Sequence, residues 1–120
     1  MPPPSILVVD DEPDIRELVG EILSDEGYDV RAAENGEAAR NAFARKVPDL
    51  VLLDFWMPDV DGITLFKEWA AGGGPPCPIV VMTGHGTLET AVEATRLGAH
   101  DLVQKPISLA RLLAIVSQAL

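Results

Sequence analysis

Residues 50–62, LVLLDFWMPDVDG, are the stretch from which the fold of this chain can be predicted. Residues 50–53 are all apolar and run directly into Asp54. A run this short and apolar is typical of a strand buried on both faces of a parallel sheet. Asp54 would then lie at the carboxyl end of that strand, where open α/β sheets place their chemistry. A turn containing Met57 follows, and then an Asp61-Gly62 pair. Taken alone, Asp54 is better explained as a cap for that turn than as a reactive group. Evidence for a reactive Asp54 must come from the rest of the chain.

Length and composition indicate one globular domain. The chain has 120 residues, enough for a single core, and 48% of them are hydrophobic and 23% charged. The net charge of −10 argues against direct binding of nucleic acid through its phosphates. Cys77 is the only cysteine, which excludes an internal disulfide and fits a reducing cytoplasm. No apolar run has the length of a membrane span, so no membrane association is expected.

The rest of the chain alternates strand-like and helix-like segments. Further strands are predicted at residues 5–10, 28–33, 79–82 and 101–104. The second of these alternates, with Tyr28, Val30 and Ala32 on one face, as expected of an edge strand. The first helix is predicted to begin at Pro13 and to end at Gly27, since these residues favour helix starts and ends respectively. Further helices are predicted from residues 35–36, after residues 61–62, over residues 87–97 and from about residue 108.

Each predicted helix carries an apolar stripe at helical spacing, which is expected to face the sheet. In chain order the stripes are Ile15, Leu18, Val19, Ile22 and Leu23; Ala39, Ala42 and Phe43; Ile63, Leu65, Phe66 and Trp69; Leu88, Ala91, Val92 and Thr95; and Leu109, Leu112, Leu113, Val116 and Leu120.

Strands that alternate with helices predict one parallel sheet covered on both faces, an open doubly wound α/β fold. The flavodoxin-like strand order 2-1-3-4-5 would place the reversal of chain direction between the first and third strands. Those strands end in Asp10-Asp11 and in Asp54. The three carboxylates are therefore expected to meet in the crevice where such folds bind ligands.

Carboxylates that share a crevice need a compensating charge. Two unit charges ~4 Å apart repel by about 4 kcal/mol at the effective dielectric of a protein surface. A small hard cation relieves this repulsion, and Mg²⁺ prefers one or two carboxylates together with water. Asp10, Asp11 and Asp54 are therefore predicted to hold Mg²⁺.

Two further polar residues follow the last two strands. Thr83 ends the fourth strand and Lys105 follows the fifth, so both are expected at the same edge of the sheet. A lysine and a hydroxyl beside a carboxylate–metal site suit an anion and phosphoryl transfer, with Asp54 as the nucleophile. The alternatives are a surface pair between Lys105 and Asp101, and a Thr83 that only caps the next turn.

The chain resembles the receiver domain of two-component response regulators over essentially its whole length. The matching segments are VVDDEPDIRELV, LVLLDFWMPDVDG, IVVMTGHG and LVQKPIS. The segment TGHGTLETAVEATRLGAHD is most similar to receivers of the nitrogen-regulation type, which precede an ATPase and a DNA-binding domain. The resemblance implies one receiver domain over residues 1–120, with residues 1–4 as a leader, and suggests that it forms the first part of a longer regulator.

The resemblance also implies roles for individual residues. Asp54 would be the phosphoacceptor, taking its phosphoryl group from a histidine of a partner sensor kinase. Asp10 and Asp11 would hold Mg²⁺, together with Asp54 and the backbone carbonyl of Trp56. Such a domain is a signalling switch rather than an enzyme with an external substrate, and catalyses only its own phosphorylation and dephosphorylation.

The resemblance assigns the other site residues as well. Thr83 would be the hydroxyl that moves toward the phosphoryl group, and Lys105 would contact that group, with a cis peptide bond to Pro106. His85 and Trp56 flank the site at positions that suit control of dephosphorylation, and Met57 lies in the turn beside them.

One position departs from the family's pattern. Leu102 stands where the family usually carries Tyr or Phe, so the usual aromatic switch cannot operate. A shift of the fourth helix, with freedom supplied by Gly84, Gly86 and Gly98, is the alternative switching hypothesis. By resemblance, the fourth and fifth helices with the fifth strand form the surface that controls an output domain. The chain would be a monomer or a phosphorylation-dependent homodimer.

The sequence argues against four other functions. A flavodoxin-like cofactor binder would need a glycine- or hydroxyl-rich loop after the first strand, where this chain has an acidic one. Asp59 and Asp61 form a D-x-D, but a metal-dependent nuclease or topoisomerase-like domain would also need a basic track, and the pair is better explained as a turn with Gly62. An aspartate-nucleophile phosphatase would need a cap domain. A receiver used only for docking would not need Asp54, Lys105 and the acidic pair.

Overall fold

The computed structural model describes residues 2–57, 59–71, 73–84 and 88–120. Within these residues, five strands alternate with five helices. The strands are β1 (Ser5–Val9), β2 (Asp29–Ala33), β3 (Leu50–Asp54), β4 (Ile79–Thr83) and β5 (Asp101–Gln104). The helices are α1 (Pro13–Asp25), α2 (Gly36–Arg45), α3 (Gly62–Ala70), α4 (Leu88–Leu97) and α5 (Leu109–Ala119).

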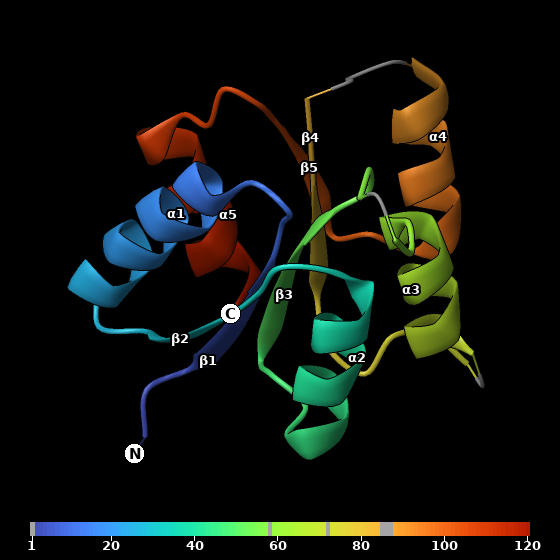
Figure 1. The fold of residues 1–120 in the computed structure, drawn as a ribbon. Coiled ribbons are helices and arrows are strands. Elements are labelled where there is room, and N and C mark those ends of the chain that lie inside the picture. The colour runs from blue at the N-terminus through green and yellow to red at the C-terminus, as the bar shows by residue number, and fades with distance from the viewer. Residues whose placement is uncertain (1, 58, 72, 85–87) are drawn as a thin grey trace.

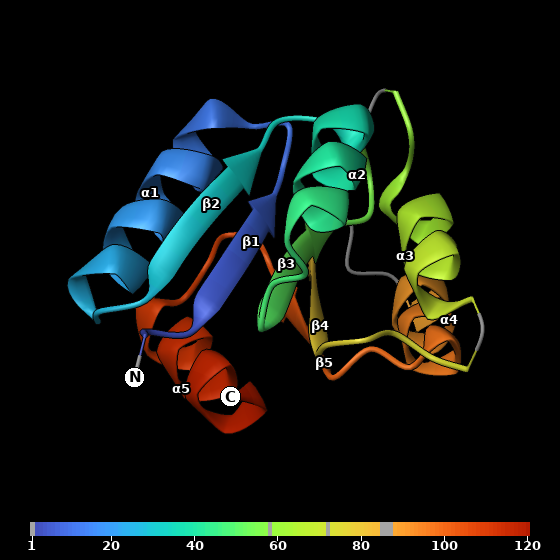
Figure 2. The same cartoon turned by 90° about the horizontal axis from the view of Figure 1, so that it is seen from below.

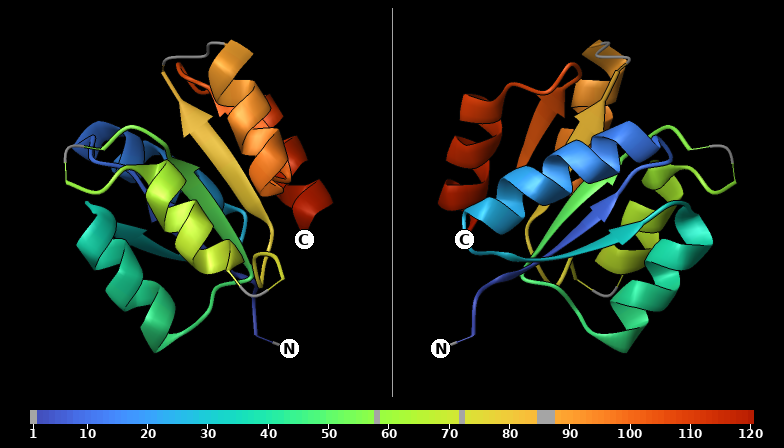
Figure 3. Two further views of the ribbon diagram at one scale, coloured as in Figure 1. Left: turned by 90° about the vertical axis from the view of Figure 1, so that its right-hand side faces the viewer. Right: turned by 60° about the vertical axis from the view of Figure 1, so that its left-hand side comes forward.

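All five strands are parallel and lie in the order β2-β1-β3-β4-β5, which confirms the predicted doubly wound sheet (Figure 1). Helices α1 and α5 cover one face of the sheet, while α2, α3 and α4 cover the other (Figure 3). Because the first crossover returns to one side of β1 and the second to the other, the carboxyl ends of β1 and β3 are neighbours at the point of reversal.

The three central strands are buried along their whole length. Their side chains alternate between two apolar layers, as a sheet covered on both faces requires. One layer packs under α2, α3 and α4 and contains Val9, Leu53 and Val81. The other packs under α1 and α5 and contains Val8, Leu52 and Met82.

Local signals fix the ends of the helices. Pro13 begins α1, and Gly27 follows it with a φ of 93°, a left-handed conformation that favours glycine. The side chains of Asn35, Asp61 and Ser108 each accept a hydrogen bond from a backbone N–H in the first turn of α2, α3 and α5 respectively.

The predicted inward face of α4 was wrong. Leu88 is 80% exposed and Val92 is 50% exposed, while Thr90 and Ala94 are buried. Residues 90, 94 and 97 repeat at the i, i+4, i+7 spacing of a helix, so this segment carries a second stripe. The structure turns the stripe of Thr90, Ala94 and Leu97 toward the core and leaves Leu88 and Val92 outside.

Smaller corrections concern single positions of other elements. Leu18 of α1 and Leu109 of α5 are 46% and 52% exposed, and Leu120 is 44% exposed. Ile115 of α5 is buried instead. In the edge strand Ala32 is exposed and Ala33 is buried, so the predicted alternation breaks at the strand's end.

None of the described helices combines the length and the apolar character that crossing a bilayer demands.

Candidate functional site

Polar side chains from four strands meet at the carboxyl edge of the sheet. Asp10 follows β1, Asp54 ends β3, Thr83 ends β4 and Lys105 follows β5. Asp10 and Thr83 have no exposed surface, and Asp54 is only 3% exposed. Burying polar side chains away from water costs free energy, so each of these residues needs partners within the protein.

Lys105 is the centre of the cluster. Its Nζ lies 2.8 Å from Asp10 Oδ2, 2.9 Å from Glu12 Oε1 and 3.5 Å from Asp54 Oδ2. The alternative pair with Asp101 is not formed, because Asp101 lies 3.5 Å from Arg111 instead. Lys105 therefore links the acidic loop after β1 to the acid at the end of β3.

The two buried carboxylates are each oriented by a backbone N–H two residues further along the chain. Asp54 Oδ1 accepts a hydrogen bond from the Trp56 N–H at 3.0 Å, and Asp10 Oδ1 accepts one from the Glu12 N–H at 2.9 Å. This is the local geometry of an Asx turn. It leaves Oδ2 of both residues facing Lys105.

The charge state of Asp54 is set mainly by its burial. Burial raises the pKa of Asp54 to about 6, against the hydrogen bond from the Trp56 N–H, which lowers it. The neighbouring charges of Asp10 and Asp11 raise the pKa further and that of Lys105 lowers it. Asp54 is therefore an acid whose charged form is poorly compensated, as expected where a further cation or an added group is to be accommodated.

Lys105 remains charged in this setting. Burial would lower its pKa, but the contacts with Asp10 and Glu12 and the nearby charge of Asp54 raise it above its ordinary value. A lysine held in this state can pair with an anion placed beside Asp54.

The residues present fit a magnesium ion. Carboxylate oxygens of Asp10, Asp11 and Glu12 lie within 4.8 Å of one another. Asp10 Oδ2 is buried without a hydrogen bond, since its contact with Lys105 is an ion pair that lacks hydrogen-bond geometry. An all-oxygen set of this kind suits a hard divalent cation. Asp54 is not part of this group of three.

The other residues predicted for the site lie around it. Thr83 is paired with Gln104 across β4 and β5, and its carbonyl accepts a hydrogen bond from the Lys105 N–H at 2.8 Å. The Lys105-Pro106 peptide bond is cis. The side chain of Trp56 is on the surface, whereas Met57 packs in the core layer below α2, α3 and α4. His85 and Gly86 lie outside the described residues.

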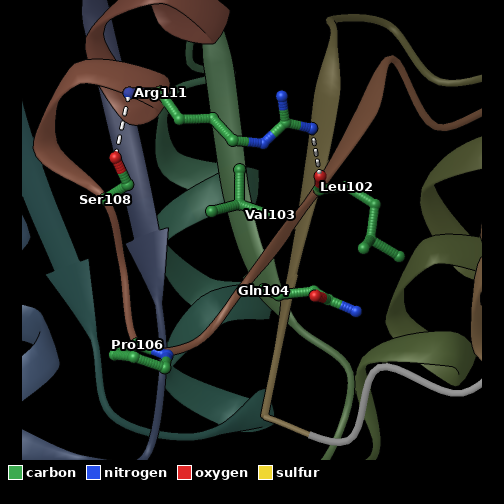
Figure 4. Close-up of a pocket in the computed structure, with 6 residues that line it drawn as sticks. All are labelled: Leu102, Val103, Gln104, Pro106, Ser108 and Arg111. Carbon is green, nitrogen blue, oxygen red and sulfur yellow. Dashed lines mark hydrogen bonds between the residues drawn. The ribbon is translucent and has the colours of Figure 1, made fainter.

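The Leu102 side chain lies on the face of the sheet that α2, α3 and α4 cover. Figure 4 shows its side chain on the opposite side of β5 from Arg111. There it packs against the core layer that includes Ala94 of α4. Its carbonyl oxygen accepts a hydrogen bond from Arg111 Nη2 at 3.2 Å (Figure 4). Leu102 therefore contacts the layer under α4. It has no aromatic ring that could change its rotamer together with Thr83.

Two contacts of the site were missed by sequence reasoning. Glu12, next to the acidic pair, binds Lys105, and its position in the run Asp10-Asp11-Glu12 was a usable signal. Asp59, treated as a turn residue, binds the start of α2, and no local pattern indicates that contact.

A buried aspartate at the end of the central strand, with an acidic loop on one side and a lysine on the other, in a sheet of order 2-1-3-4-5, is the arrangement of a phosphoacceptor signalling domain. The family comparison agrees. Residues 6–117 match the model of the response regulator receiver domain, and the chain belongs to this family. It is a receiver domain of two-component signalling.

Individual relatives are similar over nearly the whole chain. The nitrogen assimilation regulatory protein NtrX of Azorhizobium caulinodans is 43% identical over 117 residues, which are 96% of this chain and 26% of that protein. The crystal structure of the receiver domain of NtrX from Brucella abortus is 45% identical with a TM-score of 0.87, covering 95% of this chain and 96% of that one. A structure of Brucella abortus NtrX in complex with ATP is 44% identical with a TM-score of 0.89, over 99% of this chain and 27% of that one. The chain thus spans about a quarter of the length of the curated relatives it matches.

Proposed function

We propose that Asp54 accepts a phosphoryl group from a histidine of a sensor kinase, with Mg²⁺ as the cofactor. The observation that carries the proposal is the position of Asp54: 3% exposed, with a pKa raised by burial to about 6, and 3.5 Å from Lys105. A carboxylate of raised pKa is a more basic nucleophile than an ordinary aspartate, and the fixed cation beside it can pair with the negative charge that the phosphoryl group brings.

The reaction needs little from the protein beyond position and charge. An oxygen of Asp54 forms the bond to phosphorus while the bond from phosphorus to the donor's imidazole nitrogen breaks, and the imidazole leaves with the bonding electrons. The Trp56 N–H holds Asp54 Oδ1, which leaves Oδ2, the oxygen nearer Lys105, to attack. Lys105 then pairs with the phosphoryl oxygens.

Asp10 and Asp11 would hold the magnesium ion, with Asp54 and the carbonyl of Trp56. When bound, Mg²⁺ supplies positive charge to the phosphoryl oxygens. Thr83 would donate its hydroxyl to the phosphorylated site. Hydrolysis of the aspartyl phosphate by the same site would reset the domain, with the side chains of Trp56 and His85 controlling the approach of water.

The phosphorylated domain would act on an output domain of a longer regulator. Support comes from the length of the relatives, of which this chain covers about a quarter, and from the binding of ATP by one of them. We propose an ATPase and a DNA-binding domain as the output, with no direct contact between this domain and nucleic acid. The domain would work in the cytoplasm, where its free Cys77 stays reduced, as a monomer or as a phosphorylation-dependent homodimer.

The test is the intact mass of the purified chain after incubation with Mg²⁺ and a small phosphodonor. One added phosphoryl group is expected, and none in the Asp54→Asn variant or in EDTA. If the folded chain binds Mg²⁺ but gains no mass, from the small donor or from a cognate kinase, the proposal is wrong and a docking role replaces it.

Phosphorylation is expected to change amide exchange in α4. Only Thr90 and Ala94 of this helix are buried, and their small side chains bury little area; Leu97 is partly buried, while Leu88 and Val92 are exposed. It is therefore weakly held and free to shift without an aromatic residue at position 102. Hydrogen exchange of the phosphorylated and unphosphorylated chain should differ at Leu88–Leu97 and agree within α2. Unchanged exchange in α4 would exclude the helix shift.

A further inference from the structure

The loop between β3 and α3 is closed on itself at its base. The Gly62 N–H donates a hydrogen bond to the Phe55 carbonyl at 2.8 Å, so the first residue of the loop touches the first residue of α3. This loop carries Trp56, whose N–H binds Asp54. Its position therefore decides how the phosphoacceptor is oriented.

The outer part of the loop is tied to a different helix. Both carboxylate oxygens of Asp59 accept hydrogen bonds from the Gly36 N–H at 3.1 Å, and Oδ2 also accepts one from the Glu37 N–H at 3.4 Å. Figure 2 shows the loop beside the first turn of α2. The approach is close: a Cβ at Gly36 would lie 2.6 Å from Val60 Cβ.

Asp59 does not duplicate the helix's own cap. The side chain of Asn35 accepts a hydrogen bond from the Ala38 N–H at 2.8 Å. Asp59 accepts from the N–H groups of Gly36 and Glu37 instead. The first N–H groups of a helix lack partners within the helix and attract negative charge. These bonds hold the pKa of Asp59 below its usual range, so the group is charged when it binds α2.

We propose that Asp59 is a positioning residue of the phosphoacceptor site. It anchors the loop to the start of α2 and so fixes the Trp56 peptide, whose N–H binds Asp54 and whose carbonyl is a proposed ligand of Mg²⁺. The inference rests on the proposed function for its metal readout. Asp59 touches neither the acceptor nor the metal group; it acts through the loop, three residues away from Trp56 in sequence.

The chain offers a matched pair of variants to test this role. Asp59→Ala and Asn35→Ala each remove one set of hydrogen bonds from the same helix end, but only the first releases the loop. The first readout is amide exchange of the Trp56 N–H in EDTA, which requires neither metal nor phosphodonor. Asp59→Ala is expected to speed this exchange, and Asn35→Ala to leave it at the parent rate.

The second readout is a MgCl₂ titration followed by tryptophan fluorescence. Asp59→Ala is expected to weaken Mg²⁺ binding by about tenfold, the usual effect of losing a residue that orients a ligand. Asp59→Asn keeps an acceptor oxygen without the charge and should fall between parent and Asp59→Ala. Urea unfolding confirms that each variant is folded under the conditions of the titration.

Equal effects of Asp59→Ala and Asn35→Ala on the Trp56 amide would overturn the inference, since Asp59 would then be only a helix cap. An Asp59→Ala variant with the parent's exchange and affinity would overturn it as well. If the Trp56 amide responds as expected but the parent chain never takes up a phosphoryl group, the positioning role is supported and the proposed function fails.

Discussion

Replacing Asp54 with asparagine is expected to stabilise the chain at pH 7.5 by about 2–3 kcal/mol, although it removes the proposed phosphoacceptor. Burial raises the pKa of Asp54 from 3.8 to about 6 in the folded chain. The folded state therefore favours the neutral acid, and ionisation above pH 6 costs stability that an uncharged amide of similar volume does not lose. The site would be built for phosphoryl transfer at the expense of stability.

Because the pKa of Asp54 is raised in the folded chain, its effect on the free energy of unfolding depends on pH. Well below pH 3.8 the carboxyl is neutral in both the folded and the unfolded chain, so Asp54 costs least there. As the pH rises from 4 to 6 the unfolded chain loses its proton first, and the contribution of Asp54 to the free energy of unfolding falls until it levels off above pH 6. The advantage of Asp54→Asn should therefore shrink to about 1 kcal/mol at pH 4.5.

Urea unfolding in EDTA at the two pH values measures this difference. Glu21→Gln, an exposed substitution in the middle of α1, serves as the control and should stay within about 0.5 kcal/mol of the parent at both. A parent chain as stable as Asp54→Asn at pH 7.5 would contradict the prediction, because the buried charge would then be compensated by the contact with Lys105.

The meeting of Asp10 and Asp54 could be predicted because it follows from few signals. Wholly apolar runs that end in a carboxylate identify buried strands, and the reversal between β1 and β3 brings those two ends together. None of this depends on side-chain detail. The same reasoning places Thr83 and Lys105 on the same edge, where the structure has them.

The orientation of α4 could not be predicted because its sequence carries two apolar stripes. Leu88 and Val92 form one stripe and Thr90, Ala94 and Leu97 the other, and the small Thr90 and Ala94 allow the helix to pack closely on the second. Which stripe is buried depends on the space left by α3 and β5, and periodicity alone does not contain that information.

The contact of Asp59 with Gly36 lies beyond sequence reasoning for a different reason. It joins a side chain to backbone N–H groups 23 residues earlier, and such a bond leaves no spacing or composition signal. Only the folded positions of the loop and of α2 reveal it. The residues that bind the acceptor can thus be read from the sequence, whereas those that hold its loop in place cannot.

Replacing Gly62 with alanine is expected to destabilise the chain by about 3 kcal/mol. A Cβ at this position would overlap the Asp54 carbonyl oxygen and would lie 2.7 Å from Phe55 Cα. Both are backbone atoms of the strand and loop that carry the acceptor, so no side chain can move aside to relieve the contact.

Gly20→Ala is the matched control, because a Cβ at Gly20 in α1 has no neighbour within 4 Å. Alanine within a helix loses less conformational freedom on folding, so this variant should gain about 0.5–1 kcal/mol. Urea unfolding should therefore move the two variants in opposite directions. If Gly62→Ala were as stable as the parent, the loop would have to open at its base, and the Trp56 N–H would then exchange faster than in Gly20→Ala. A stable variant with a protected Trp56 amide would show that the close approach of Gly62 to β3 is not required to hold the loop.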